Sequence, residues 1–249
     1  MAFGQDEIER YARHLVLREI GGPGQQKLKA AKVLVIGAGG LGGPTALYLA
    51  AAGVGTLGLV DADTVSLSNL QRQILFETGD VGAPKTEVAK KHLADLNPHV
   101  AVVSHLLALT PQNARDLVRG YDLILDGVDD FAVRFAINQA CLDEGKVLVS
   151  GAIGRWTGQV AVLSGKPCYR CLVPEIPPEA ETCSAVGVVG ALAGVIGAMM
   201  AMEAIKVITG AGEPLLGRLL IYDGLSAEAR TVKLSADPAC PACGGGPKS

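Results

Sequence analysis

Residues 32–42 read KVLVIGAGGLG, an apolar run that leads directly into a glycine-rich stretch. The run KVLVI has the composition of a buried strand, and the alanine-rich residues 40–52 predict a helix after the glycines. A strand, a G-x-G-x-x-G loop and a helix in this order predict a site for nucleotide phosphates, because backbone amides at a helix N-terminus attract anions. The glycines of this loop are Gly37, Gly39, Gly40 and Gly42.

A second strand ends on an acidic residue that suits the same ligand. Residues 56–60 predict this strand, and Asp61 follows it, 19 residues after Gly42. A carboxylate in this position can accept hydrogen bonds from both ribose hydroxyls of a nucleotide. The loop and the acid suit ATP, NAD and FAD equally, and a tight turn that binds no ligand is the remaining alternative.

Strands and helices alternate on both sides of this motif. Such alternation predicts an α/β fold with a Rossmann-like, mostly parallel sheet that is covered on both faces. After residue 150 the expected strands follow one another without short helices, which predicts an antiparallel C-terminal extension. The expected strands are 32–36, 56–60, 100–104, 121–126, 146–150, 158–163, 218–222 and 228–234, and the expected helices between the first five are 40–52, 86–96, 111–119 and 131–144.

Three further segments have distinctive patterns. Residues 6–18 predict an amphipathic helix, and the Gly-Gly-Pro-Gly run at 21–24 is expected to break the chain after it. The 18 residues at 185–202 carry one charge-free apolar run, which is the lower limit for a membrane span. Its four glycines and the lack of a flanking basic cluster favour a buried helix, so we expect no membrane association.

Composition excludes several classes of protein. Hydrophobic residues make up 49% of the 249 residues and charged residues 19%, so the chain can bury a large core and is not disordered. A formal net charge of −3 argues against a nucleic-acid partner, which would require a clustered basic face. The N-terminus lacks a basic region followed by an apolar run, which predicts a cytoplasmic protein.

Four of the six cysteines form two Cys-x-x-Cys pairs separated by 68 residues. Four thiolates from two such pairs predict a closed, structural zinc site, and two disulfides are the alternative. Cys141 lies mid-helix among apolar residues and is predicted to be a small core residue. The predicted zinc ligands are Cys168, Cys171, Cys240 and Cys243.

Residues 61–73, DADTVSLSNLQRQ, resemble the signature of ubiquitin-activating-type adenylyltransferases. Within that superfamily the chain resembles the bacterial MoeB/ThiF/HesA family over nearly its whole length. The other matching motifs lie at 10–13, 37–42, 82–85, 126–130, 168–171 and 201–206.

The resemblance implies an enzyme that uses ATP and Mg²⁺ to adenylate the C-terminal carboxylate of a small ubiquitin-like sulfur-carrier protein ending in Gly-Gly. Release of pyrophosphate would activate the carrier for thiocarboxylate formation in molybdopterin, thiamin or a related sulfur pathway. The resemblance also implies a homodimer. A separate sulfur donor protein is expected because the chain leaves no room for a rhodanese-like domain. One domain is expected, with an N-terminal arm at 1–26, a nucleotide-binding half at 27–150 and a carrier-binding half at 151–249.

The family pattern assigns roles within the nucleotide site. Arg72 and Lys85 would supply positive charge to the triphosphate, where charge repulsion opposes attack by a carboxylate. Ser68 and Asn69 would add neutral polar contacts. Asp129 would hold magnesium, a hard cation that prefers oxygen ligands.

Three further residues carry open alternatives. The family commonly has Asp-Asn where this chain has Asp129-Asp130, so Asp130 is equally placed to cap the helix that starts at Phe131. Arg13 would reach the triphosphate from the second subunit of the homodimer. Cys183 would accept the carrier's carboxyl group or would be inert.

Two other functions compete with adenylation. An NAD-dependent oxidoreductase would use the same glycine loop but would leave Arg72, Lys85 and the cysteine pairs unexplained. A non-catalytic module that docks a sulfur carrier would bind its partner and would tolerate loss of Asp129.

Overall fold

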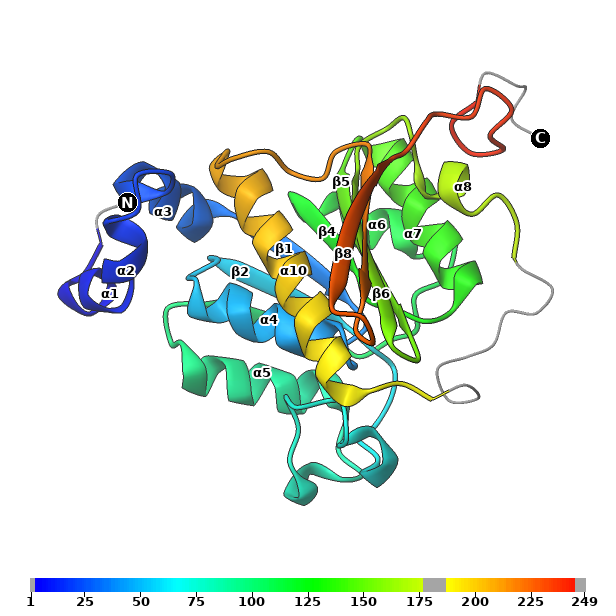
Figure 1. Ribbon diagram of the computed structural model, residues 1–249. Coiled ribbons are helices and arrows are strands. Elements are labelled where there is room, and N and C mark those ends of the chain that lie inside the picture. Colours follow the sequence, from blue (N-terminus) through cyan, green and yellow to red (C-terminus); the bar gives the residue numbers. More distant parts are fainter. Residues whose placement is uncertain (1–2, 177–186, 245–249) are drawn as a thin grey trace.

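The computed structural model describes residues 3–176 and 187–244, and its centre is one eight-stranded sheet (Figure 1). The strand order is β3-β2-β1-β4-β5-β6-β7-β8. Pairing is parallel from β3 to β5 and antiparallel from β5 to β8. The predicted α/β class with an antiparallel extension is therefore confirmed. The strands are β1 (Lys32–Ile36), β2 (Thr56–Val60), β3 (Ala101–His105), β4 (Leu123–Asp126), β5 (Val147–Gly154), β6 (Thr157–Leu163), β7 (Arg218–Asp223) and β8 (Glu228–Lys233).

Helices cover both faces of the parallel part of the sheet. Helices α4, α5 and α10 lie on one face and α6 and α7 on the other (Figure 1). The helices are α1 (Gln5–Arg10), α2 (Ala12–Leu15), α3 (Gly21–Ala30), α4 (Gly42–Ala51), α5 (Lys85–Leu96), α6 (Ala114–Arg119), α7 (Phe131–Glu144), α8 (Tyr169–Leu172) and α10 (Gly190–Thr209), with the short 3-10 turns η1 (Leu67–Asn69) and η2 (Thr78–Asp80).

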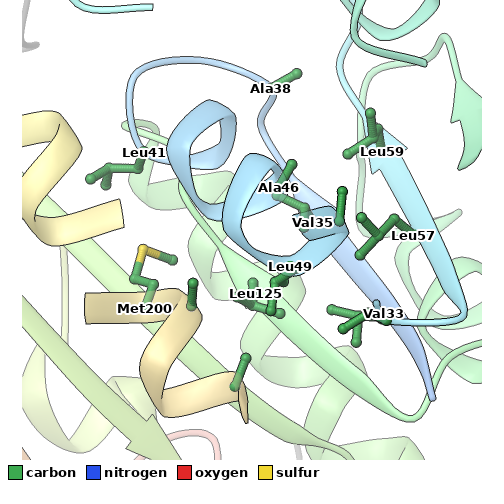
Figure 2. Close-up of a cluster of buried hydrophobic side chains, with 14 of the residues drawn as sticks. Val33, Val35, Ala38, Leu41, Ala46, Leu49, Leu57, Leu59, Leu125 and Met200 are labelled. Carbon is green, nitrogen blue, oxygen red and sulfur yellow. The ribbon is translucent and has the colours of Figure 1, made fainter. Parts of the chain in front are cut away.

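Strand β1 shows why the fold needs an unbroken apolar run. Val33 and Val35 face the core beneath α4 and α10, whereas Leu34 and Ile36 face the core beneath α6 and α7. Alternate residues of a strand point to opposite faces, so a central strand with helices on both sides is apolar throughout its buried part, here residues 33–36. Figure 2 shows the first of these cores, where Leu49 of α4 and Met200 of α10 lie near the sheet.

The N-terminal segment differs from the prediction. The helix expected at 6–18 is divided into α1 and α2 at Tyr11, whose buried ring lies against Gly53 and whose hydroxyl accepts a hydrogen bond from Asn97 (2.9 Å). The expected break at 21–24 is wrong, because these residues form the first turn of α3. A proline in the first turn of a helix costs no hydrogen bond, since the amides there lack an intrahelical acceptor.

The long apolar helix is α10, which begins five residues later than the expected segment. By length and composition alone it could cross a membrane. It instead packs against α4, β5 and β6, and its Glu203 is buried. Glu203 accepts a hydrogen bond from the amide of Leu215 (2.8 Å) and pairs with Lys206. These contacts identify α10 as a core helix.

Candidate active site

A cavity of about 580 Å³ opens beyond the carboxyl ends of β1 and β4. Strand β1 pairs with β2 on one side and with β4 on the other, so the chain order reverses at this point. In open α/β sheets such a reversal leaves a crevice in which ligands bind. The cavity is walled by the glycine loop, the segment after β2, the 69–73 segment and the loop after β4. It also has an apolar side suited to a planar base, formed by Ile36, Leu107, Leu109 and Phe131.

The glycine loop forms the floor of this cavity. Gly37 has a φ of +86°, a backbone conformation that glycine adopts without strain. Gly39 and Gly40 line the cavity with it, whereas Gly42 starts α4. A Cβ on Gly42 would lie 1.7 Å from the carbonyl oxygen of Gly37. The fourth glycine is therefore required for the tightness of the turn and not for space around a ligand.

Asp61 lies at the edge of the glycine loop and lines the cavity. Its Oδ2 accepts a hydrogen bond from the amide of Ala38 (2.8 Å), and its Oδ1 accepts one from the amide of Asp63 (2.9 Å). The carboxylate thus holds the loop in place. Each carboxylate oxygen can accept a further hydrogen bond, so a ribose contact is compatible with this arrangement.

Two cations reach the cavity from separate elements. Lys85 is the first residue of α5, is only 4% exposed, and places Nζ 2.8 Å from Oδ2 of the exposed Asp63. Arg72 follows η1 and donates from Nη1 to the carbonyl oxygen of Ser68 (3.2 Å). Both line the cavity together with Asn69. A buried ammonium group needs compensating negative charge, and Asp63 supplies it here.

The two adjacent acids after β4 have different surroundings. Asp130 is the N-cap of α7, where its Oδ1 accepts a hydrogen bond from the amide of Val133 (2.9 Å). Asp129 is exposed and lines the cavity, as Asp130 also does. The capping alternative for Asp130 is therefore confirmed, and Asp129 lines the same cavity as the two cations.

Two predicted residues lie away from the cavity, and a third is outside the described residues. Ser68 and Arg13 are not among the described residues that line the cavity. Ser68 contacts Ser66 through their hydroxyl groups (3.1 Å), and Arg13 is exposed on α2. A contact from Arg13 across a dimer stays a prediction. Cys183 lies outside the described residues, so its predicted role also stays a prediction.

The sequence reasoning missed a buried ion pair beneath the loop that carries Asp129. Asp126 ends β4 and Arg134 lies on α7, with 3.3 Å between Oδ2 and Nη1. Burial raises the pKa of the Asp126 carboxyl, while Arg134 and the amide of Val128 act against this rise. The sequence did contain a sign of this pair, because Asp126 ends the otherwise apolar strand β4. A buried acid in such a strand requires a charged partner.

The four predicted zinc ligands meet beside α8. Their Sγ atoms all lie within 4.8 Å of one another, with Cys168 3.6 Å from Cys240 and Cys171 3.4 Å from Cys243. A disulfide requires about 2 Å between the sulfurs, so the disulfide alternative does not fit. Four thiolates around zinc lie roughly 3.8 Å apart, given a Zn–S distance of about 2.3 Å, and this arrangement fits. Cys141 is buried in the core as predicted, and burial raises its pKa to about 12.

The ThiF family model matches residues 11–242 of this chain, a span that includes both the cavity and the cysteine cluster. The chain belongs to the ThiF family. This confirms the MoeB/ThiF/HesA resemblance of its motifs.

Several ThiF-family relatives have names that state an activity. The chain is 47% identical to the sulfur carrier protein adenylyltransferase of Thermus thermophilus, over 99% of this chain and 94% of that protein. It is 48% identical to the probable adenylyltransferase/sulfurtransferase MoeZ of Mycobacterium tuberculosis, over 96% of this chain. It is 49% identical to the adenylyltransferase and sulfurtransferase MOCS3-2 of Zea mays, also over 96%. The chain spans 63% of the MoeZ length and 51% of the MOCS3-2 length.

Solved structures show the same fold. MccB of E. coli with MccA-N7isoASN has a TM-score of 0.83 at 24% identity, covering 96% of this chain and 75% of MccB. MccB of E. coli with ATP has a TM-score of 0.80 at 25% identity, covering 94% of this chain and 74% of MccB. The ThiF-family sheet of this chain therefore has the arrangement seen in MccB.

Helix α10 of this ThiF-family chain sets the position of Arg72. A Cβ on Gly190 would lie 2.1 Å from the carbonyl oxygen of Gln71, the neighbour of Arg72. We expect Gly190→Ala to displace this segment and to lower the adenylation rate about 10- to 100-fold, as small misplacements of reacting groups do. Gly194→Ala is the matched control on the same helix, because its Cβ would meet no atom within 4 Å. Equal adenylation rates for the two variants would contradict the role of Gly190 in positioning Arg72.

Loss of one cysteine ligand is expected to destabilise the chain. We expect Cys240→Ala to lower the bound zinc to well below one ion per chain and to lower Tm by roughly 5–15 °C, since the cluster ties the C-terminal segment to α8. Cys141→Ala removes a thiol outside the cluster and should leave the zinc content unchanged. Metal analysis and thermal unfolding of both variants provide the test. Unchanged zinc content in Cys240→Ala would exclude a zinc site at these cysteines.

Proposed function

We propose that this chain adenylates the C-terminal carboxylate of a small ubiquitin-like sulfur carrier ending in Gly-Gly, using ATP and releasing pyrophosphate. The observation that carries the proposal is the meeting of Arg72, Lys85 and Asp129 around one cavity with the glycine loop as its floor. These residues come from three separate segments of the chain. Together they supply the charges that transfer of an adenylyl group needs.

The reaction brings two anions together. A carboxylate oxygen of the carrier attacks the α-phosphorus of ATP, the bond from that phosphorus to the bridging oxygen breaks, and pyrophosphate leaves. The carboxylate is already ionised at neutral pH, so no side chain has to act as a general base. Arg72 and Lys85 would offset the repulsion between the anions and stabilise the charge on the leaving group. Positioning and electrostatics would therefore provide most of the catalysis.

Asp129 would hold Mg²⁺, which binds phosphate oxygens and draws negative charge away from them when present. Its surroundings fit this role, because the side chain is exposed to the cavity, whereas Asp130 uses an oxygen to cap α7. Asp61 would accept the ribose hydroxyls while its amide contacts keep the glycine loop in place. The four cysteines would hold zinc in a structural role, because four sulfur ligands leave no open coordination position.

The named relatives support this assignment, since all three are adenylyltransferases by name and the Thermus protein is described as acting on sulfur carriers. The adenylyltransferase class predicted from the sequence agrees with these names. An NAD-dependent oxidoreductase would leave the pairing of Arg72 with the buried Lys85 at one cavity, and the cysteine cluster, unexplained. We further propose a cytoplasmic homodimer in which Arg13 serves the partner's site, a separate sulfur donor, and Cys183 as a candidate acyl acceptor.

The decisive experiment is ATP–pyrophosphate exchange with a panel of sulfur carriers ending in Gly-Gly. Exchange should depend on Mg²⁺ and on one carrier of the panel. The same carrier lacking its last glycine is the matched control, because it folds alike but cannot place its carboxylate at the α-phosphorus. No exchange with any carrier, together with tighter binding of NAD than of Mg-ATP in a titration, would favour the oxidoreductase.

A further inference from the structure

Arg134 connects the loop that carries Asp129 to two strands of the sheet. Its guanidinium donates to the carbonyl oxygens of Val128 and Gly151, the latter at 2.7 Å. It also contacts Oδ2 of Asp126 (3.3 Å) and Oγ of Ser150 (3.2 Å). Val128 directly precedes Asp129, so the position of this guanidinium determines the path of the backbone that presents Asp129 to the cavity.

The same guanidinium lies over the aromatic ring of Tyr169, which is next to the cysteine cluster in the sequence. Cζ of Arg134 is 5.6 Å from the centre of the Tyr169 ring, and both residues are no more than 4% exposed. A cation–π contact of this kind is stronger when it is shielded from water. Tyr169 directly follows Cys168 and lines the nucleotide cavity. One side chain therefore contacts both the cavity and the metal-binding turn.

Asn138 forms a second connection on the same face of α7, four residues after Arg134. Its Oδ1 accepts a hydrogen bond from the amide of Tyr169 (2.8 Å). Its Nδ2 is buried and has no hydrogen-bond partner among the described residues. This nitrogen is therefore an available donor beside the turn that carries Cys168.

We propose that Arg134, Asn138 and Tyr169 form a strut that couples metal occupancy of the cysteine cluster to nucleotide binding in the cavity. The inference rests on the proposed function, because it concerns the affinity of the same site for ATP. With zinc bound, the turn at 168–171 is held and Tyr169 stays on Arg134. Without zinc, Tyr169 is released, Arg134 loses one of its supports, and the loop that carries Asp129 is no longer confined.

The expected coupling can be measured as a change in nucleotide affinity. Titration with Mg²⁺ and the non-hydrolysable analogue AMPCPP gives Kd for the zinc-loaded chain, for the chain after chelation, and after zinc is returned. We expect Kd to rise about tenfold on zinc removal and to recover on its return, within the usual range of coupling between sites. Metal content and circular dichroism are recorded at each stage.

Substitutions at Tyr169 separate this strut from general destabilisation. Tyr169→Leu removes the aromatic face, so the zinc-loaded variant should keep one zinc per chain, bind about tenfold more weakly and lose the response to chelation. Tyr169→Phe retains the face, so its zinc-loaded form should bind more tightly than that of Tyr169→Leu and should keep the response to chelation. If chelation unfolds the wild type, the test is instead the Kd of zinc-loaded Tyr169→Leu against the Kd of zinc-loaded Tyr169→Phe. Equal Kd values for these two variants overturn the proposal.

Other outcomes also count against the strut. A folded, zinc-free wild type with unchanged Kd overturns it, as does a chain that does not take up zinc. If no form binds Mg-AMPCPP, the proposed function fails instead. Hydrogen exchange at the backbone amides of residues 127–134 then tests the strut by itself. Faster exchange on zinc removal in the wild type but not in Tyr169→Leu supports it, and an unchanged rate overturns it.

Discussion

Asp129→Asn is expected to lower the rate of carrier-dependent ATP–pyrophosphate exchange by roughly 10³-fold. The substitution keeps the shape of the side chain but removes the charge that would hold Mg²⁺, whose stabilisation of phosphate charge is worth several kcal/mol. Because the side chain is exposed to the cavity, the fold should be retained. Exchange is measured over a range of Mg²⁺ concentrations, since weakened metal binding should also shift the requirement to higher Mg²⁺.

The adjacent acid supplies a matched control for this substitution. Asp130→Asn changes the same functional group one residue away, and asparagine caps helices about as well as aspartate. We expect its exchange rate to stay within about twofold of wild type, and its Tm to be unchanged, because the cap on Val133 is kept. If Asp130→Asn were the damaged variant and Asp129→Asn the active one, the assignment of the two acids would be reversed.

Lys85→Ala is expected to lower the same exchange rate by about 10²- to 10³-fold, the usual cost of losing one group that stabilises charge in the transition state. The ammonium group is buried at the edge of the cavity, where its interaction with phosphate is less screened by water than at the surface. The partner that remains, Asp63, has a side chain that is 71% exposed, so it can be hydrated and the stability should change little.

Two controls make this result specific to Lys85. Lys90→Ala removes a lysine from the exposed face of the same helix and should leave exchange unchanged. Lys85→Arg keeps the charge but places a larger, planar group in a buried site, so we expect only partial activity. A Lys85→Ala variant with normal exchange kinetics and normal binding of Mg-ATP would remove Lys85 from the site.

The glycine loop could be predicted from the sequence because its requirements are local. A run of apolar residues, four glycines and an alanine-rich segment adopt a strand, a turn and a helix with little help from the rest of the chain. The cysteine pairs could be predicted for a similar reason, because each Cys-x-x-Cys turn offers two ligands in one short segment. A four-coordinate metal site, the chemistry that two such pairs predict, requires the two pairs to meet, and the structure brings them together.

The N-terminal segment shows where local patterns are insufficient. Glycine and proline at 21–24 predict a break, but the folded chain uses them as the start of α3. Tyr11 interrupts the preceding helix because its ring is buried against Gly53 and its hydroxyl is bonded to Asn97. Both contacts join residues at least 42 positions apart, and such long-range packing overrides helix propensity.

The sequence by itself determined the α/β class, the glycine loop, the acid at Asp61 that contacts this loop, and the four clustered cysteines, because each depends on the order of neighbouring residues. Only the tertiary structure decided that Asp130 caps α7, that the buried Lys85 lines the same cavity as Arg72, and that Asp126 is paired with Arg134. The physical reason is that burial and charge pairing depend on which segments the sheet brings together. Residues 63 and 85, and likewise 126 and 134, meet where the chain leaves the carboxyl ends of β2 and β4.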